Sequence, residues 1–127
     1  MNILVIEDEP ASRKLATLVL ASGGHQVVDA SSAEEAVKTV HHAQPEIILL
    51  DLALPGMDGL ALARQLKNDS NTRHIPIVAV TSYPERFSRD EAFRAGCDAY
   101  IVKPIDTRAL SGQIDAIAGK TRPLDKQ

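Results

Sequence analysis

Apolar residues in this chain fall into short continuous runs that alternate with longer amphipathic segments. The runs are rich in Val, Ile and Leu, as expected for strands that are buried on both faces of a sheet. They predict five strands, near 2–6, 26–30, 46–50, 76–80 and 99–102. The amphipathic segments predict helices near 10–22, 32–42, 57–68, 84–95 and 106–119. This alternation indicates a single doubly wound α/β domain with a parallel sheet.

The helical segments differ in how clearly their apolar positions repeat. Leu15, Leu18 and Val19 share one face of the first predicted helix. The fourth predicted helix is mostly polar between Glu85 and Glu91, so its period is the weakest of the five. Five strand–helix units use residues 2 to about 119. We therefore expect one domain over residues 1–120, followed by a short polar tail at 121–127.

Composition narrows the class of protein. The chain has 127 residues, of which 44% are hydrophobic, so it can bury a sizeable core. Its 14 basic and 17 acidic residues give a net charge of −3 with no long run of either sign, which argues against a nucleic-acid partner. The single cysteine, Cys97, excludes an internal disulfide and fits a reducing compartment. No apolar stretch is long enough to span a membrane, and we expect a cytoplasmic protein.

Four of the apolar runs stop at residues that can take part in phosphate chemistry. They lead into Glu7 and Asp8, Asp51, Thr81, and Lys103. In a parallel sheet the carboxyl ends of the strands lie along one edge, where open α/β sheets place their ligand sites. We therefore expect three carboxylates, one hydroxyl and one ammonium to converge there. Such a set suits a divalent cation together with a phosphoryl group.

The acidic residues at this edge predict a magnesium site. Clustered carboxylates repel one another, and a cation can hold them ionised. Oxygen ligands completed by water favour Mg²⁺. We expect Asp8 and Asp51 to be direct ligands, with Glu7 second, directly or through water. No His or Cys falls near these strand ends, which argues against zinc.

Asp51 also meets the requirements of a nucleophile. A carboxylate can accept a phosphoryl group to give an acyl phosphate, provided that the charge on the phosphoryl oxygens is neutralised. A metal ion on one side and Lys103 on the other would do this. Thr81 could then donate a hydrogen bond to a phosphoryl oxygen.

These features occur together, and in this order, in a known family. They are the acidic pair Glu7-Asp8, the run over residues 48–59 that contains Asp51, the hydroxyl of Thr81, the aromatic Tyr100, and Lys103-Pro104. The chain resembles a receiver domain of a two-component response regulator, specifically a stand-alone one with the fold of the chemotaxis regulators. The resemblance covers essentially the whole chain.

The resemblance has several implications. It implies a flavodoxin-like five-stranded sheet in the order 2-1-3-4-5, and transfer of a phosphoryl group to Asp51 from a histidine kinase or histidine phosphotransfer protein, with Mg²⁺ required. The backbone carbonyl of Ala53 would be a third metal ligand, and the bond before Pro104 would be cis. Thr81 and Tyr100 would switch the surface of the fourth helix, fifth strand and fifth helix for a downstream protein target.

The chain departs from the common family pattern around the phosphoryl site. Ala53, two residues after Asp51, often carries a longer polar side chain in relatives. Ser82 is more usually Ala, and Tyr83 stands where several relatives have an acid or amide. Ala53 and Tyr83 flank the expected phosphoryl group, so they bear on how long the phosphorylated state lasts.

Other functions fit the sequence less well. A phosphatase of the haloacid dehalogenase type would need a general acid two residues after its nucleophile, where this chain has Ala53. A nucleotide-binding module would need Gly or hydroxyl residues in the first strand–helix loop, which is acidic here. A phosphorylation-independent scaffold would be expected to lose Asp51 or Lys103. We therefore expect a signalling protein that catalyses only its own phosphorylation and dephosphorylation.

Several residues also have purely structural interpretations. Tyr100 is either a packed strand residue or an aromatic switch. Cys97 is expected in the core, while His25 and His74 are expected at the surface. Three arginines on the fourth predicted helix form either a solvated face or a contact with a partner: Arg86, Arg89 and Arg94.

Overall fold

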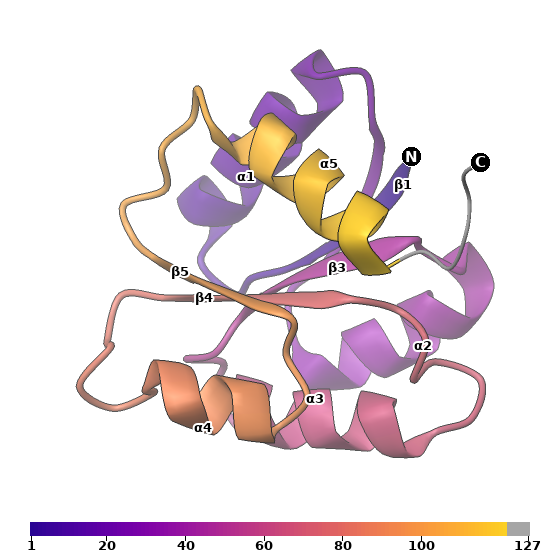
Figure 1. Ribbon diagram of the computed structural model, residues 1–127, viewed down its shortest axis with the longest axis vertical. Coiled ribbons are helices and arrows are strands. Elements are labelled where there is room, and N and C mark those ends of the chain that lie inside the picture. Colours follow the sequence, from indigo (N-terminus) through magenta and orange to yellow (C-terminus); the bar gives the residue numbers. More distant parts are fainter. Residues whose placement is uncertain (122–127) are drawn as a thin grey trace.

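Five parallel strands form the centre of the structure, a computed structural model that describes residues 1–121 (Figure 1). The strand order is β2-β1-β3-β4-β5, which confirms the predicted topology. The strands are β1 (Asn2–Ile6), β2 (Gln26–Ala30), β3 (Ile47–Asp51), β4 (Ile77–Thr81) and β5 (Ala99–Val102). β1, β3 and β4 are the inner strands, and they carry the continuous apolar runs because both of their faces are covered.

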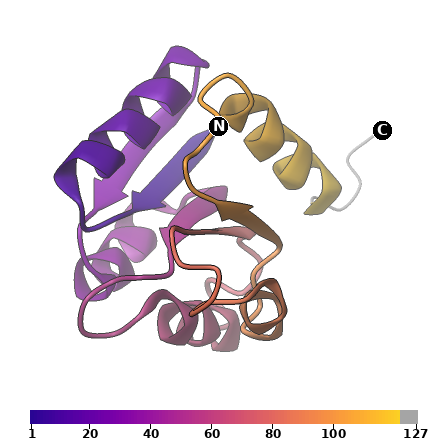
Figure 2. The same ribbon diagram turned by 90° about the vertical axis from the view of Figure 1, so that its left-hand side faces the viewer.

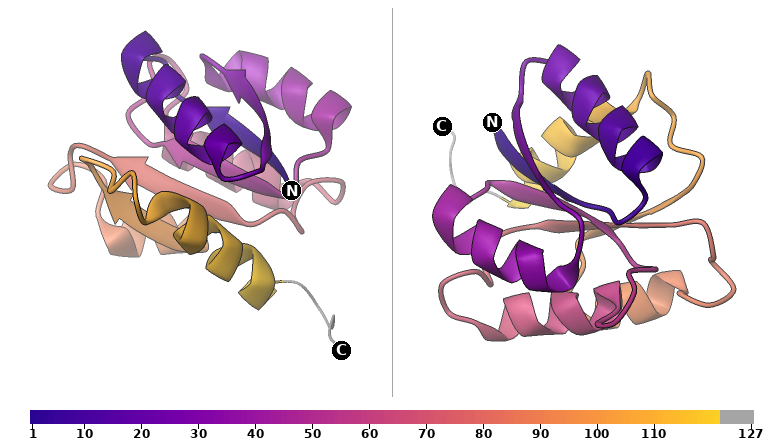
Figure 3. Two further views of the ribbon diagram at one scale, coloured as in Figure 1. Left: turned by 90° about the horizontal axis from the view of Figure 1, so that it is seen from above. Right: turned by 180° about the vertical axis from the view of Figure 1, so that it is seen from behind.

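Helices cover both faces of the sheet. They are α1 (Pro10–Ser22), α2 (Ala33–Ala43), α3 (Gly59–Asn68), α4 (Arg89–Arg94) and α5 (Leu110–Thr121). In Figure 1, α1 and α5 lie above the sheet while α2, α3 and α4 lie below it, and Figure 2 shows the same layers edge on. Figure 3 shows α1 beside α5, and α2 beside α3. None of the helices in the described range is long and apolar enough to cross a membrane.

The alternation of side chains along each strand divides the core in two. Leu4, Ile48 and Leu50 point to the side of α2, α3 and α4. Their neighbours Val5 and Leu49 point to the side of α1 and α5. A one-residue change of register would exchange the two sets, so the pairing of the strands is strongly specified.

The fourth helix is shorter than predicted. α4 begins at Arg89, whereas the sequence pattern suggested a helix over 84–95. Ser88 caps it: the Ser88 hydroxyl accepts from the Glu91 amide, and the Glu91 carboxylate accepts from the Ser88 amide. The residues before the cap form a turn in which the carbonyl of Tyr83 accepts from the amides of Arg86 and Phe87. We call residues 83–87 the switch turn.

Three other helices also start later than predicted, α2 by only one residue, and two strands end later. The Asp58 side chain caps α3 by accepting from the Ala61 amide, so this helix starts at Gly59 and not at 57. The segment from Asp106 forms a turn before α5 starts at Leu110. β3 and β4 each lie one residue further along the chain than predicted, so Asp51 and Thr81 are the last residues of their strands.

The face of α1 that packs on the sheet differs from its apolar repeat. Leu15 and Leu18 are 49% and 57% exposed, while Ala16 and Leu20 are buried. Only Val19 of the predicted set lies against the core. The helix orientation turns the small side chain inward, leaving two leucines at the surface.

The prediction that His25 is a surface residue is wrong. Its side chain is largely buried, with Nε2 3.1 Å from the Ser111 hydroxyl and 3.4 Å from an Asp115 oxygen on α5. The turn after α1 comes this close because Gly23 has no side chain: a Cβ there would lie 2.4 Å from the Ser111 hydroxyl. The predictions for Cys97, which is buried, and His74, which is exposed, are confirmed. The predicted tail lies outside the described residues, apart from Thr121.

Candidate functional site

The carboxylates predicted to meet at the sheet edge do meet. Asp51 is the last residue of β3, and Glu7 and Asp8 directly follow β1, its neighbour in the sheet. One carboxylate oxygen from each of the three lies within 4.8 Å of the others. Within the described residues this is the one group of metal-ligating side chains that close together. An all-oxygen set of this kind fits Mg²⁺ and gives no nitrogen or sulfur ligand for zinc.

Lys103 joins the cluster from the other side. Its Nζ lies 2.6 Å from Glu7 Oε1 and 3.3 Å from Asp51 Oδ2. The Lys103–Pro104 bond is cis, as predicted. One ammonium therefore bridges two carboxylates, and the carboxylate it approaches more closely is Glu7.

The protonation of Glu7 is strongly perturbed. Burial and, after it, the nearby Asp51 together raise the pKa of Glu7 from 4.5 to about 7, although the hydrogen bond from Lys103 opposes the change. For Lys103, burial lowers the pKa, but its hydrogen bond to Glu7 and the charge of Asp51 outweigh burial and raise it overall. The site therefore pairs the Lys103 ammonium with a Glu7 carboxyl that is harder to ionise than an ordinary glutamate.

The loop after β3 fixes the Asp51 side chain. The backbone amide of Ala53 donates to Asp51 Oδ1 at 3.0 Å, which leaves Oδ2 facing Lys103. The loop then folds back so closely that a Cβ at Gly59 would lie 2.5 Å from the Leu52 Cα. Glycine is required at this approach. The proposed role of the Ala53 carbonyl as a metal ligand stays a prediction.

Thr81 and Tyr100 hold opposite ends of the switch turn. The buried Thr81 hydroxyl accepts from the amide of Tyr83 at 2.9 Å. The Tyr100 hydroxyl donates to the carbonyl of Phe87 at 2.5 Å, while its ring packs on the core beside α4. Tyr100 is therefore a packed strand residue that also tethers this turn. The sequence pattern gave no sign of this link.

Sequence reasoning also missed Arg13 on α1. Its Nη1 donates to the carbonyl of Glu7 at 3.0 Å and to that of Asp8 at 3.4 Å, and its Nε lies 3.9 Å from Asp29. The guanidinium thus holds the backbone of the loop that presents both acids. Because the contacts that Arg13 makes with this loop are to backbone carbonyls, no residue pattern could have revealed them.

A pocket of about 390 Å³ opens beside Asp51. Ser12 and Ala16 of α1 line one side of it, and Pro104 and Ile105 line another. The small side chains on α1 leave this space open. Ser82 also lines the pocket, whereas the ring of Tyr83 reaches solvent.

Comparison with known proteins agrees with this geometry. The response regulator receiver domain family matches residues 3–115. The chain is 37% identical over 123 residues to the phosphate regulon transcriptional regulatory protein PhoB of Escherichia coli, covering 97% of this chain and 54% of PhoB. It therefore spans about half the length of this relative. It is 31% identical over 116 residues to protein PilH of Pseudomonas aeruginosa, covering 91% of this chain and 96% of PilH.

A solved structure extends the comparison to the site. The receiver domain of a sensor histidine kinase from Pseudomonas aeruginosa PAO1 superposes with a TM-score of 0.84 at 28% identity, covering 93% of this chain and 97% of that one. That structure has a magnesium ion coordinated in its active site cleft. The fold, the strand order and the family match point the same way: this chain belongs to the response regulator receiver domain family.

Proposed function

We propose that this protein is a phosphoacceptor in a two-component phosphorelay and that Asp51 is the residue phosphorylated. The observation that carries the proposal is the position of Asp51 at the end of an inner strand, between two further acids and the Lys103 ammonium. A lone carboxylate there would be an ordinary strand end. A carboxylate with a neighbouring ammonium and a cation site can attack phosphorus.

The step moves one phosphoryl group. An Asp51 oxygen forms a bond to phosphorus as the bond from phosphorus to the donor nitrogen of a phosphohistidine breaks, and the imidazole leaves. Mg²⁺, held by Asp8 and Asp51 with Glu7 beside them, would neutralise phosphoryl charge. Lys103, whose Nζ lies 3.3 Å from Asp51 Oδ2, would bind the phosphoryl oxygens from the other side. Arg13 keeps the acidic loop in place, and the Ala53 amide keeps Asp51 oriented.

Thr81 would transmit the effect of phosphorylation to the switch turn. Its hydroxyl accepts from the Tyr83 amide at rest, so it must leave that amide to bond a phosphoryl oxygen. The switch turn then loses one of its two side-chain tethers. We infer that the α4, β5 and α5 surface changes in consequence and acts on a downstream protein target.

The partners follow from the same chemistry. A histidine kinase or histidine phosphotransfer protein would approach Asp51 at the pocket between α1 and the loop after β5. The chain would act only on its own phosphoryl group, because Ala53 supplies no general acid for turnover of other substrates. One buried cysteine and no disulfide fit a cytoplasmic site of action.

Intact-mass measurement after incubation with acetyl phosphate tests the proposal. With Mg²⁺ the protein should gain one phosphoryl group, and with a chelator it should gain none. Asp51→Asn should remain unlabelled while its circular dichroism spectrum stays that of the native protein. Labelling of the Asn variant to the native level would disprove the assignment of Asp51.

A further inference from the structure

His41 and Asp69 face each other where two helices end, far from the carboxylate edge of the sheet. His41 lies in the last turn of α2, and Asp69 directly follows α3. The Nε2 atom of His41 lies 3.7 Å from Asp69 Oδ2. Since α2 leads into β3 and α3 leads into β4, the pair lies at the amino ends of these strands, whereas Asp51 lies at the carboxyl end of β3.

The hydrogen bond at the other ring nitrogen determines what His41 presents to Asp69. Its Nδ1 lies 2.8 Å from the backbone carbonyl of Val37. A carbonyl oxygen can only accept, so Nδ1 carries the hydrogen, and Nε2 of the neutral ring presents a lone pair. The lone pair and a carboxylate oxygen then face each other, and a cation between them would stabilise both. Histidines that bind metal ions usually donate their other N–H to a carbonyl or a carboxylate in this way.

Asp69 is oriented by a hydrogen bond of its own. Its Oδ1 accepts from the backbone amide of Asn71 at 2.9 Å, which leaves Oδ2 facing His41. Lys67, the lysine nearest to it in sequence, donates instead to Asp98 and to two backbone carbonyls. In the part of the chain that the structure describes, His41 is therefore the one ion-pair partner of Asp69.

The position of the pair favours a positive charge. α2 has 11 residues and α3 has 10, and both end here. The carbonyl end of a helix carries a partial negative charge, which attracts cations and repels anions. Two helix ends and one carboxylate thus act on the same point.

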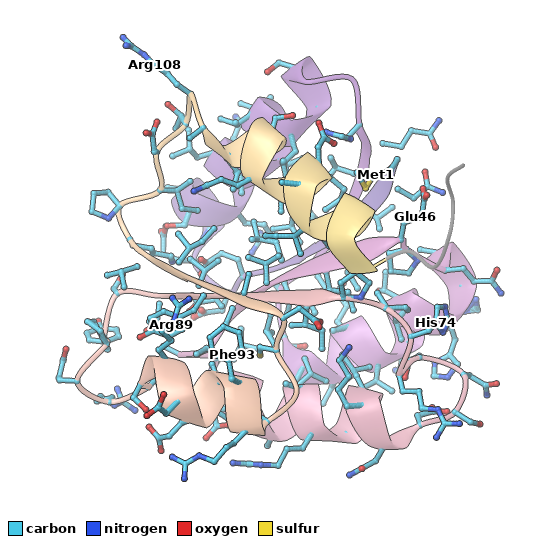
Figure 4. The ribbon with its side chains drawn as sticks, in the orientation of Figure 1. Met1, Glu46, His74, Arg89, Phe93 and Arg108 are labelled. Atoms are coloured by element: carbon cyan, nitrogen blue, oxygen red, sulfur yellow. The ribbon has the colours of Figure 1, made fainter. Side chains whose placement is uncertain are left out.

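A pocket of about 870 Å³ brings a third possible ligand to the pair. His41 and His74 both line it. Figure 4 shows His74 near the start of β4, beside the end of α2. The His74 side chain is exposed and makes no hydrogen bond or ion pair with the rest of the described residues. His74 is not as close to the pair as the acids of the sheet edge are to one another, so its ring would turn inward to join them.

We propose that His41, Asp69 and His74 bind Zn²⁺ and that the ion joins the end of α2 to the loop between α3 and β4. Two imidazole nitrogens, one carboxylate oxygen and a water form a ligand set that zinc takes. The separation of 3.7 Å between the first two ligand atoms is near the about 3.4 Å that zinc bonds at tetrahedral angles require. The carboxylate edge contributes nothing to this site, so the inference is independent of the proposed function.

The alternative is an ion pair between a protonated His41 and Asp69. Exposed ion pairs are common and weak, and this one would need neither His74 nor a metal ion. The two arrangements respond to pH in opposite ways. An ion pair requires the imidazolium, whereas zinc binds only the neutral ring.

Isothermal titration calorimetry of the full chain with ZnCl₂ tests the proposal. Mg²⁺ is present in excess, so that it occupies the carboxylate edge. The test variants are His41→Gln, Asp69→Asn and His74→Gln, and Asp69→Asn keeps an oxygen that can accept from the backbone amide. The matched control is His42→Gln, at an exposed histidine in the same turn of α2. Circular dichroism and labelling by acetyl phosphate, measured without zinc, verify that each variant is folded.

We expect one Zn²⁺ per chain, with an affinity that falls by about tenfold or more in each test variant and stays native in His42→Gln. Native affinity in His41→Gln or Asp69→Asn, or an equal loss in His42→Gln, would leave only the ion pair and overturn the proposal. Native affinity in His74→Gln would overturn the set of three ligands. Loss of zinc binding in Asp8→Ala would place the ion at the carboxylate edge and would overturn the proposal as well.

Discussion

The carboxylate edge of the sheet and the segment that follows β4 are held in very different ways. Glu7 and Asp51 are buried at the ends of inner strands, and their side chains are fixed by Lys103 and by backbone amides. The switch turn and α4 are mostly exposed, and α4 has six residues. Phe87 and Ala92 anchor this segment in the core, and the Thr81 and Tyr100 side chains each make one hydrogen bond to its backbone.

This contrast fits a division of tasks, in which the carboxylate edge carries out the reaction and the segment after β4 changes conformation in response. A nucleophile gains from a fixed position because reaction requires aligned atoms. A reporter segment gains from weak attachment, because a small free energy can then move it between two arrangements. Thr81 belongs to both regions: its backbone is in β4, while its hydroxyl holds the switch turn.

The largest effect on the carboxylate edge is expected from removing its cation site. Mg²⁺ relieves repulsion among the three acids, so it should stabilise the native protein by about 2.7 kcal/mol at a concentration 100 times its Kd. Asp8→Ala should weaken Mg²⁺ binding by about tenfold or more and suppress labelling by acetyl phosphate. Thermal unfolding with and without Mg²⁺ measures the first effect. If Mg²⁺ changed the melting temperature of neither the native protein nor the Asp8→Ala variant, this would contradict the proposed cation site.

The second test uses pH without Mg²⁺. Since the pKa of folded Glu7 is raised from 4.5 to about 7, the folded state holds this proton longer than the unfolded state does. Between these values the unfolding free energy should therefore fall as pH rises, and the contribution should be constant above about pH 7. The raised pKa of Lys103 affects the unfolding free energy only at much higher pH.

Glu7→Gln should abolish this contribution, so that the native-minus-variant difference in unfolding free energy changes by about 3 kcal/mol across the window. Urea unfolding in chelator at several pH values measures it. Glu34→Gln is the control, because Glu34 lies outside the acidic cluster, and it should leave the pH dependence of the native protein unchanged. A Glu7→Gln difference that is flat with pH would show that the proton is not held there.

The sequence predicted the carboxylate edge of the sheet better than the segment that follows β4. Inner strands are marked by unbroken apolar runs, so the meeting of Asp51 with Glu7 and Asp8 followed from the pattern, whereas the order of the strands came from the resemblance to receiver domains. The start of α4 did not, because 84–88 has no apolar period, although Ser88 and Glu91 have the spacing of a capping box. The buried face of α1 was also missed, since packing turned Ala16 inward and left Leu15 outside.

A smaller effect is expected from releasing the weakly held region. Tyr100→Phe removes the hydrogen bond to the Phe87 carbonyl, at a cost of about 1 kcal/mol. Amides of residues 83–94 should exchange with solvent faster, while labelling of Asp51 stays native. Tyr83→Phe is the matched control, because among the described residues the Tyr83 hydroxyl makes no hydrogen bond. Equal exchange in the two variants would show that Tyr100 does not tether the turn.

The smallest effect concerns how long the phosphorylated state lasts, where the two regions meet. Hydrolysis of the acyl phosphate needs a water held in line, and polar side chains beside the phosphoryl group can orient it. Ala53 offers no hydrogen bond on one flank, and Tyr83, which the family resemblance places on the other, has an exposed ring. We therefore expect slow loss of the phosphoryl group. Ala53→Asn should speed its decay severalfold, less than the tenfold that about 1.4 kcal/mol of barrier would give. Ala53→Val, which adds bulk without a hydrogen bond, should not. Decay of the native protein as fast as that of the Asn variant would show that these flanks do not set the lifetime.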